Sequence, residues 1–314
     1  MTKLDQRIKK APEDTVKQSW VNKLSPDFAW GYLQLIRADR PIGTWLLLWP
    51  GLWSIGLVSH KYGMGIFEAN LNLILLFTIG AFVMRGAGCV VNDLWDQKAD
   101  GQVERTKGRP LPSGRVSRLG AMIFLGFLCL IGLMVLVQLN KFSQMVGLFS
   151  LILIIIYPLM KRITYWPQLM LGFTFNWGAL MGWAAVSGTI ELPAIMLYIG
   201  GIFWTLGYDT IYAHQDKQDD TLIGVKSTAL KFADKTHIWL CCFYSACILL
   251  LTASGYLCGL NIGFYIGMIV SAGHLIYQLK KLDIDDREMC LKLFKSNHHF
   301  GLIVFLSIVA GHYI

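Results

Sequence analysis

The stretch Asn92-Asp93-Leu94-Trp95-Asp96-Gln97-Lys98-Ala99-Asp100 decides the fold, because it closes a long apolar run with a row of acidic side chains. Asn92, Asp96 and Asp100 are spaced by four residues and share one stripe of an α-helix, with Asp93 at its edge. Neighbouring carboxylates repel one another unless a cation lies between them. Oxygen ligands suit a hard cation, Mg²⁺ above all, and Mg²⁺ commonly brings a phosphate with it. The stretch therefore predicts a hydrophobic helix that ends in a site for a metal ion and a phosphate.

A second acidic stretch follows more than a hundred residues later, Tyr208-Asp209-Thr210-Ile211-Tyr212-Ala213-His214-Gln215-Asp216-Lys217-Gln218-Asp219-Asp220. Asp209, Asp216 and Asp220 are spaced by seven and four residues, which again places them on one helical stripe. This stretch also closes a long apolar run. Two such clusters indicate two halves of one metal-diphosphate site.

The composition is that of a membrane protein. The 314 residues are 54% hydrophobic and 15% charged, with a mean hydropathy of +0.49, whereas about 25% of residues are charged in soluble domains. A net charge of +8 could indicate nucleic-acid binding, but excess Lys and Arg in a membrane protein usually mark cytoplasmic loops. The seven cysteines lie mostly in apolar runs without metal-ligand spacing and are interpreted as buried thiols. We therefore predict a polytopic membrane protein that binds no nucleic acid.

Hydropathy divides the chain into a polar tail, residues 1–30, and a single transmembrane domain, residues 31–314. Each apolar run of this domain approaches the roughly 20 residues that a bilayer requires. Nine runs are predicted to be transmembrane helices: 42–59, 71–91, 119–138, 143–159, 168–187, 194–214, 237–258, 262–279 and 299–313. The predicted fold class is all-α. Gly178 and Gly182 are four residues apart in the fifth run, which favours close packing of that helix within the chain.

Basic residues are distributed unevenly between the loops. Of the 28 Lys and Arg residues, Lys61 and Lys141 alone fall in the loops on one side, and Arg85 falls inside a helix. All the others lie on the side of the amino terminus, together with both acidic clusters. By the positive-inside rule, that side is the cytoplasm or the mitochondrial matrix.

Several residues within the apolar runs are candidates for substrate binding. Arg85 precedes Asn92 by seven residues and lies deeper on the same helical face, where an isolated cation is costly and so is often functional; pairing with an acid for folding is the alternative. Tyr157 and Tyr212 could stabilise a carbocation with their ring faces, although such residues more often pack or lie at the membrane interface. Asn176 either lines the site or bridges two helices.

Cations in the loops on the acidic side could bind the phosphate oxygens that a metal leaves free. The candidates are Arg105, Lys161, Arg162 and Lys226. For any one of these residues the alternative is that it serves membrane topology alone.

With both acidic stretches, the chain closely resembles the UbiA family of intramembrane aromatic prenyltransferases. The first stretch contains the pattern N-D-x-x-D-x-x-x-D, and the second contains Y-D-x-x-Y-A-x-x-D-x-x-D-D, which is similar to the 4-hydroxybenzoate branch. Further matching segments are Arg37-Ala38-Asp39-Arg40-Pro41-Ile42-Gly43, Arg109-Pro110-Leu111-Pro112-Ser113-Gly114, Tyr157-Pro158-Leu159-Met160-Lys161-Arg162 and Gly224-Val225-Lys226-Ser227-Thr228. One departure is Ala233, where this branch usually has glycine.

The resemblance implies nine helices around a central cavity, and transfer of a polyprenyl group from its diphosphate to 4-hydroxybenzoate in ubiquinone synthesis. Mg²⁺ would be the cofactor, and the two substrates and the lipid bilayer would be the partners. The implied catalytic acids are Asp96, Asp100, Asp216 and Asp220, which would ligate Mg²⁺ together with Asn92, with Asp93, Asp209 and Asp219 close by. Either Arg37 or Arg85 would hold the benzoate carboxylate.

Two other functions compete with this prediction. One is a prenyltransferase of the same family for a different aromatic acceptor, which the Tyr-Asp-x-x-Tyr-Ala pattern disfavours. The other is a cation-coupled secondary transporter, although transporters place such sites near the bilayer midplane and often in repeats. Acids in the amino-terminal tail argue against a transit peptide and favour a bacterial inner membrane, with the mitochondrial inner membrane as the alternative. The chain length of the prenyl group and the oligomeric state are left open.

Overall fold

The computed structural model describes residues 7–8, 12, 15–68, 70–102, 106–217, 224 and 226–313. In this part the chain forms α-helices, two short 3₁₀ turns and loops, without strands. The chain separates into two compact units. The first unit comprises Met1–Thr44 and Ile79–Val135, and the second comprises Trp45–Thr78 and Leu136–Ile314.

Eight helices among the described residues are long and apolar enough to cross a membrane. They span Ile42–Lys61, Leu71–Lys98, Arg118–Leu136, Pro167–Ser187, Leu192–Asp216, Thr228–Cys258, Ile262–Lys281 and Arg287–Tyr313, and a shorter apolar helix covers Lys141–Tyr157. The predicted all-α, multi-pass membrane protein is confirmed, and the predicted count of nine is close to this set. The share of buried residues within these spans differs widely, from 78% for Ile42–Lys61 to 11% for Arg118–Leu136.

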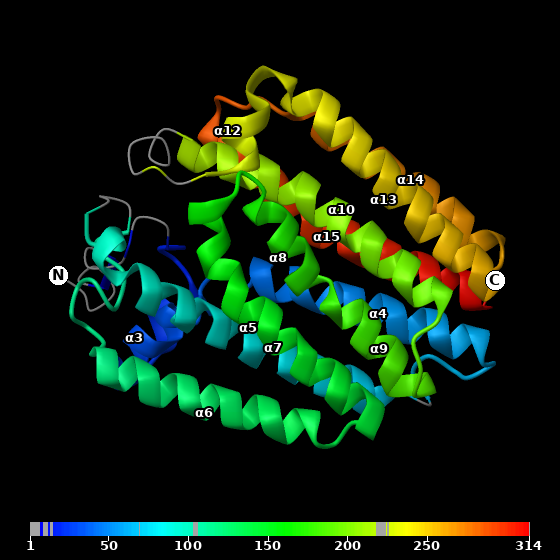
Figure 1. Ribbon diagram of the computed structural model, residues 1–314, viewed down its shortest axis with the longest axis horizontal. Coiled ribbons are helices and arrows are strands. Elements are labelled where there is room, and N and C mark those ends of the chain that lie inside the picture. The colour runs from blue at the N-terminus through cyan, green and yellow to red at the C-terminus, as the bar shows by residue number, and fades with distance from the viewer. Residues whose placement is uncertain are drawn as a thin grey trace. The chain divides into compact units, whose positions relative to one another are not determined.

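The first unit contains α2 (Trp20–Leu24), α3 (Asp27–Leu35), most of α5 (Leu71–Asp100) and α6 (Arg118–Leu136) (Figure 1). Ser19 caps α2 by accepting a hydrogen bond from the backbone N–H of Asn22, and Pro26 separates α2 from α3. The buried side chains of this unit come from α3, α5, α6 and the loop before α6, and include Leu35, Val83, Val90, Leu111, Val116 and Leu128. This core fixes the carboxyl-terminal half of α5, which carries the first acidic stretch.

The second unit contains most of α4 (Ile42–Lys61) and the helices from α7 (Lys141–Ile163) onward. They are α8 (Pro167–Phe175), α9 (Trp177–Ser187), α10 (Leu192–Ala213), α12 (Thr228–Phe232), α13 (Thr236–Cys258), α14 (Ile262–Lys281) and α15 (Arg287–Tyr313), with the 3₁₀ turns η1 (His214–Asp216) and η2 (Ala233–Lys235). Within this unit α10 packs along α13, and α14 packs along α15 (Figure 1). α10 carries the second acidic stretch.

Aromatic side chains form the centre of the second unit. The ring of Trp204 lies 5.1 Å from that of Trp53 and 5.2 Å from that of Phe300, centroid to centroid. The indole N–H groups of these two tryptophans both have partners, because Trp204 donates to Oδ1 of Asn297 and Trp53 donates to the carbonyl oxygen of Gly301. These contacts bring α4, α10 and α15 together.

The predicted single helix over 168–187 is two helices, α8 and α9, which meet at Asn176. The Asn176 side-chain amide donates to the carbonyl oxygen of Gly172, which also accepts from the backbone N–H of Asn176, and to Oγ1 of Thr205. The expected close packing at the two glycines of this run is confirmed within the chain. A Cβ on Gly182 would lie 2.7 Å from the carbonyl oxygen of Gly51 on α4.

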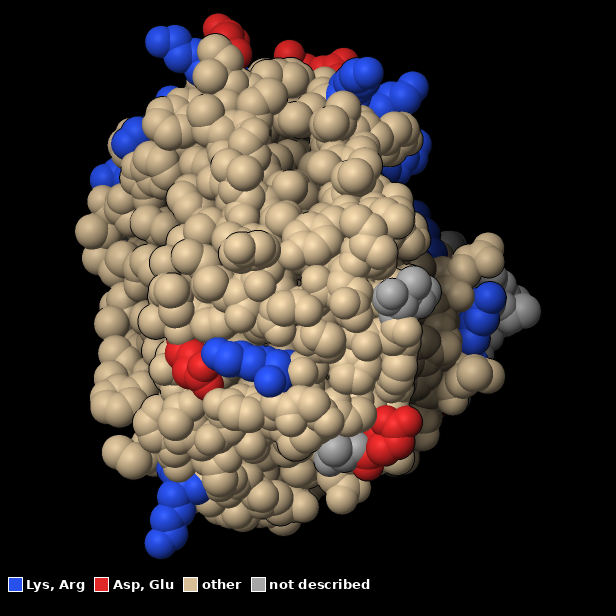
Figure 2. Space-filling view, turned by 90° about the vertical axis from the view of Figure 1, so that its right-hand side faces the viewer, with Lys and Arg blue, Asp and Glu red and all other residues tan. Residues whose placement is uncertain are grey.

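One face of the molecule carries few charges. Figure 2 shows a surface that is mostly uncharged, with scattered Lys and Arg and few acids, one of them in contact with a basic side chain. In the second unit, Lys61 at the end of α4 forms an ion pair with Glu191, which also accepts a hydrogen bond from Tyr62 at 2.6 Å. The hydrogen bond from Lys61 and the one from Tyr62 lower the pKa of Glu191.

Candidate functional site

Three carboxylates are buried at the carboxyl-terminal end of α5. The exposed fraction is 0% for Asp93, 7% for Asp96 and 9% for Asp100, and Asn92 is half-buried. α5 remains helical as far as Asp100, so the predicted stripe of Asn92, Asp96 and Asp100 is present. A buried carboxylate is costly without a cation or hydrogen-bond donors. The environment of these acids therefore decides what the site can bind.

Two arginines from other segments of the first unit form ion pairs with two of these acids, Asp93 and Asp100. Nη2 of Arg37 lies 2.7 Å from Oδ1 of Asp93. Nη1 of Arg109 lies 2.8 Å from Oδ2 of Asp100 and 3.7 Å from Oδ1 of Asp93. Two of the three carboxylates are thus paired with guanidinium groups at this end of α5. Arg37 was a predicted site residue. Arg109 was not one, and the only signal for it in the sequence was the matching segment Arg109-Pro110-Leu111-Pro112-Ser113-Gly114.

The segment that follows α5 is shaped to present Arg109. The backbone N–H of Arg109 donates to the carbonyl oxygen of Thr106. The backbone N–H of Ser113 donates to the carbonyl oxygen of Arg109. Leu111 is 2% exposed and packs in the core of the first unit, while Gly114 closes the turn with φ +73°. Oγ1 of Thr106 donates to the carbonyl oxygen of Asp100. These contacts tie the turn to the end of the acidic helix.

Arg37 has an unusual backbone conformation. Its φ is +60°, and among the described residues other than glycine this left-handed region is shared only with Ala233, at φ +43°. The N–H of Arg37 and its Nη1 both donate to the carbonyl oxygen of Gln34, which locks this conformation. Backbone strain of this kind is common at functional sites. Ala233, which replaces the glycine usual in the resembling branch, occupies a position that suits glycine.

Arg85 is half-buried on α5, two turns before Asn92. Its Nη1 lies 2.7 Å from Sγ of Cys89. A Cβ on Gly43, the last residue of the Arg-Ala-Asp-Arg-Pro-Ile-Gly segment, would lie 3.0 Å from Nη2 of Arg85 and closer still to Nε. The guanidinium group therefore rests against the glycine backbone, and this contact links Arg85 to the segment that contains Arg37.

The donor chemistry at the end of α5 fits Mg²⁺. Oδ2 of Asp93 is buried and has no hydrogen-bond partner in the described part of the chain, and the available donors are hard oxygens. Burial and the neighbouring Asp93 raise the pKa of Asp100, against the lowering effect of Arg109. No group of three or more His, Cys, Asp or Glu residues close enough to hold a metal occurs among the described residues.

The second acidic stretch departs from the predicted uninterrupted helical stripe. α10 ends at Ala213, and the chain tightens into η1 over His214–Asp216. A 3₁₀ turn advances by about 120° per residue instead of 100°, which rotates Asp216 relative to Asp209 on α10. Both side chains are half-buried. The predicted site residue Asp220, its neighbour Asp219 and the predicted Arg105 lie outside the described residues.

The aromatic and basic candidates of the second unit lie in several places. The ring of Tyr212 lies 4.4 Å from that of Phe294 on α15. Tyr157 is half-buried on α7, and the same helix carries Lys161 and the exposed Arg162 near its end.

Lys226 has a local partner. Its Nζ donates to the carbonyl oxygen of Ile163, the last residue of α7, and lies over the ring of Tyr165 at 5.5 Å. A cation here stabilises the carboxyl-terminal end of a helix. The contact accounts for Lys226 structurally, and its role in substrate binding stays a prediction.

Asn176 bridges helices, which is one of the two roles considered for it. It is fully buried, and a Cβ on Gly201 of α10 would lie 2.6 Å from its Cγ. Its amide bond to Thr205 continues to Tyr208, because Oγ1 of Thr205 donates to Oη of Tyr208 at 3.1 Å. A substrate contact for Asn176 stays a prediction.

The sequence matches known proteins over most of its length. The model of the UbiA prenyltransferase family matches residues 47–308. The mitochondrial 4-hydroxybenzoate polyprenyltransferase of Drosophila melanogaster is 52% identical over 281 residues, which cover 89% of this chain and 71% of that protein. The protein of the same name from Homo sapiens is 49% identical over 283 residues, which cover 90% and 75%.

Solved structures show the same fold. The apo structure of a UbiA homolog from Aeropyrum pernix K1 matches with a TM-score of 0.66 at 21% identity, over 85% of this chain and 96% of that chain. A UbiA homolog from Archaeoglobus fulgidus bound to GPP and Mg²⁺ matches with a TM-score of 0.65 at 17% identity, over 90% and 98%.

Proposed function

Because the chain belongs to the UbiA prenyltransferase family, we propose that it is a 4-hydroxybenzoate polyprenyltransferase of ubiquinone synthesis. The C–O bond between the allylic carbon and the diphosphate breaks, and diphosphate leaves with the electron pair. A new C–C bond forms at the ring carbon next to the phenol, and that carbon loses its proton. The names of relatives that are 52% and 49% identical support this acceptor.

The observation that carries the proposal is the group of buried acids and arginines at the end of α5. Asp93, Asp96 and Asp100 supply hard oxygens, while Arg37 and Arg109 supply planar donor groups that match phosphate oxygens. The arginines hold the acids in this structure and can turn to the phosphate oxygens when a diphosphate is present. A site with both kinds of group can bind a metal-diphosphate.

Mg²⁺ is the cofactor of the proposed reaction. We assign its ligands to Asn92, Asp96, Asp100, Asp216 and Asp220. When bound, Mg²⁺ neutralises charge on the diphosphate and makes it a better leaving group. Asp93 and Asp209 then serve to hold the surrounding cations.

The remaining candidates divide between the two substrates. Either Arg37 or Arg85 holds the benzoate carboxylate, since both carry a bidentate fork in the first unit. Phosphate oxygens are assigned to the cations of the loops and of α7, and the faces of Tyr157 and Tyr212 to the allylic cation. These cations are Arg105, Lys161, Arg162 and Lys226.

The membrane is part of the proposal. The polyprenyl chain of the substrate lies in the bilayer beside the transmembrane helices. The amino terminus lies on the same side of the membrane as the two acidic clusters. The relatives cited above are named mitochondrial, which supports the mitochondrial inner membrane. The bacterial inner membrane favoured by the acidic tail has no support among them.

A transfer assay in membranes tests the proposal. Membranes that contain the protein are incubated with labelled 4-hydroxybenzoate, a polyprenyl diphosphate and Mg²⁺, and the labelled product is extracted into organic solvent. We expect a prenylated 4-hydroxybenzoate that is absent with the Asp96→Asn variant. Transfer to homogentisate or 1,4-dihydroxy-2-naphthoate in place of 4-hydroxybenzoate would show that another acceptor is the substrate.

A further inference from the structure

α2 and α3 bury part of their apolar side chains in the core of the first unit, but they also expose three large apolar side chains and bury two polar ones. Trp20, Leu24 and Phe28 are spaced by four residues and are 51%, 79% and 82% exposed. Asn22 and Gln34, on the other side of the same segment, are each 1% exposed. A row of exposed large apolar side chains marks a surface that contacts lipid or protein. The arrangement suits a segment whose outer side contacts lipid.

The buried polar side chains form one hydrogen-bonded group. Oδ1 of Asn22 accepts from Nε1 of Trp30 at 2.8 Å and from Nε2 of Gln34 at 3.3 Å. Oε1 of Gln34 accepts from Nη1 of Arg115 at 2.9 Å. Nη1 of Arg7 donates to the carbonyl oxygen of Asn22. The amide of Gln34 is therefore held at both ends, which fixes the end of α3.

This group leads directly to the acids of α5. The carbonyl oxygen of Gln34 accepts from Nη1 of Arg37 at 3.1 Å, and Nη2 of the same guanidinium group contacts Oδ1 of Asp93 at 2.7 Å. The backbone N–H of Arg37, the residue with φ +60°, also donates to the carbonyl oxygen of Gln34 at 3.0 Å. A displacement of Gln34 must move the guanidinium group of Arg37.

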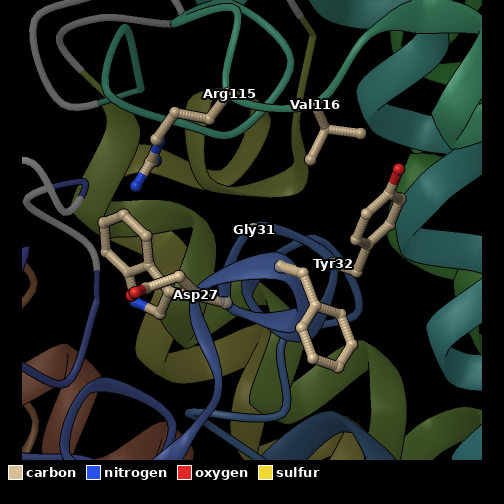
Figure 3. Close-up of a pocket in the computed structure, with 7 residues that line it drawn as sticks. Asp27, Gly31, Tyr32, Arg115 and Val116 are labelled. Atoms are coloured by element: carbon tan, nitrogen blue, oxygen red, sulfur yellow. The ribbon is translucent and has the colours of Figure 1, made fainter.

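The close-up in Figure 3 shows how α3 meets the loop before α6. Arg115 points across the cavity from the loop, and its guanidinium carbon lies 4.6 Å from the ring centroid of Trp30. Gly31 faces Val116, whose Cγ2 would be 2.9 Å from a Cβ at that position. The cavity between them measures about 250 Å³. This close approach leaves α3 little freedom to shift.

A contact with α6 places α3 beside the amino-terminal part of a spanning helix. The ring of Tyr32 lies 5.1 Å from that of Phe124, less than two turns inside the start of this spanning helix at Arg118. α3 therefore lies beside the end of α6 that begins at Arg118, and the end of a spanning helix is where the lipid headgroups are expected. Trp is common at this level, and the exposed Lys17 and Lys23 beside the apolar row suit an anionic lipid surface.

We propose that α2 and α3 dock on the bilayer surface through Trp20, Leu24 and Phe28, and that Gln34 thereby positions Arg37 on Asp93. Gln34 is a positioning residue, since it acts through its contact with Arg37. The proposal rests on the proposed function in one respect, the assignment of Arg37 to substrate binding.

A double-mutant cycle between Gln34 and Arg37 tests the positioning. Gln34→Leu keeps the volume and removes both amide contacts, and we expect kcat/KM to fall about tenfold through the KM of one substrate. Combined with Arg37→Lys, it should cause no further loss beyond that of Arg37→Lys alone. Gln34→Glu keeps the acceptor for Arg115 and should recover most of the KM. If the loss of kcat/KM in the double variant equalled the product of the two single losses, the proposal would be overturned.

The docking is tested with two serine variants in liposomes of phosphatidylcholine and phosphatidylglycerol. Phe28→Ser removes the most exposed side chain of the row, and Val137→Ser is the control, an exposed apolar residue in the turn after α6. Phe28→Ser should cause the same KM change as Gln34→Leu. Combined with Arg37→Lys, it should cause no loss of kcat/KM beyond that of Arg37→Lys alone. Val137→Ser should leave KM and kcat/KM unchanged. Equal effects of the two serine variants would overturn the docking.

Hydrogen exchange separates this inference from the proposed function. The amide of Arg37 is protected by its bond to Gln34, so Gln34→Leu and Phe28→Ser should speed exchange of residues 35–38 in liposomes, and Val137→Ser should not. If the wild-type protein transferred no prenyl group, the proposed function would be refuted. The exchange of residues 35–38 would still test the positioning, because it does not depend on prenyl transfer. Unchanged exchange in both variants would refute the positioning.

Discussion

Gly43 supports the guanidinium group of Arg85 with its backbone. No other residue fits at position 43 while Arg85 keeps its place, because a Cβ would lie 3.0 Å from Nη2 and closer to Nε. The contact joins the Arg-Ala-Asp-Arg-Pro-Ile-Gly segment to α5 at a depth in the membrane where a cation needs an anionic partner. Position 43 therefore controls where the charge of Arg85 lies.

Gly43→Ala should displace Arg85 and lower kcat/KM by roughly ten- to a hundredfold, since a shift of about 1 Å in a binding group can cost that much. The control is Gly88→Ala on α5, where a Cβ would meet nothing within 4 Å. Steady-state kinetics of both variants provide the measurement. Equal activity of Gly43→Ala and Gly88→Ala would show that the position of Arg85 does not matter for the reaction.

Arg85→Lys distinguishes the two anions that Arg85 could hold. If Arg85 binds the carboxylate, the variant should weaken 4-hydroxybenzoate binding more than prenyl diphosphate binding, because Lys lacks the bidentate fork. The expected loss is about 1.5–3 kcal/mol, or ten- to a hundredfold. A rise in the prenyl diphosphate KM would instead assign Arg85 to the diphosphate. Kinetics with each substrate varied in turn decide the matter, and unchanged KM and kcat would remove Arg85 from the site.

Asp96→Asn and Asp216→Asn should each abolish prenyl transfer while the protein still inserts into the membrane. An amide keeps the size of the carboxylate but loses its negative charge, which makes it a weaker ligand for Mg²⁺. Turnover is measured at saturating Mg²⁺, and membrane insertion is checked by extraction with carbonate. Near wild-type turnover in either variant is incompatible with a metal site shared by the two acidic stretches.

Chelation should remove the activity, and the choice of metal should follow ligand hardness. With EDTA we expect no transfer, with recovery on addition of Mg²⁺ or Mn²⁺ and no dependence on Zn²⁺, because the assigned ligands are oxygens. The measurement is product formation after metal replacement in buffer treated to remove trace ions. Full activity in excess EDTA contradicts the assignment.

Arg109→Gln should destabilise the protein in a way that Mg²⁺ corrects. Without this guanidinium group, buried Asp100 and Asp93 lose a cation, at a cost of about 1–3 kcal/mol. A bound Mg²⁺ would replace the lost charge, so Mg²⁺ should raise the Tm of the variant more than that of the wild type. Thermal unfolding in detergent with and without Mg²⁺ measures this difference. An equal Mg²⁺ effect on both proteins would place the ion elsewhere.

Sequence reasoning was most successful where hydropathy and spacing determine the structure. The helix that carries Asn92, Asp96 and Asp100 extends to Asp100 as expected, because its stripe follows from the geometry of the helix itself. Ala233 was noted as an alanine in place of glycine, and it has φ +43°. In both cases the signal is local in the sequence.

Features that depend on contacts between distant segments could not be predicted. At the break, the Asn176 side chain forms a hydrogen bond with Thr205 on another helix, which the sequence does not reveal. The end of α10 at Ala213 could not be predicted either, because the spacing of the acids continues regularly to Asp216. The pairing of Arg109 with Asp100 depends on the turn between them. A pattern of spacings contains no information on which cation will reach which acid.

The uneven burial of the spanning helices has an evolutionary consequence. In α6 only 11% of the spanning window is buried, so its sequence is constrained chiefly by hydropathy, and exchanges among Leu, Ile, Val, Phe and Met should be nearly neutral. In α4 the buried share is 78%, and there each exchange alters a packed contact. Substitutions should therefore accumulate fastest in α6 as lineages diverge, and slowest in α4. The substitution rate should therefore differ between these two helices of the same gene.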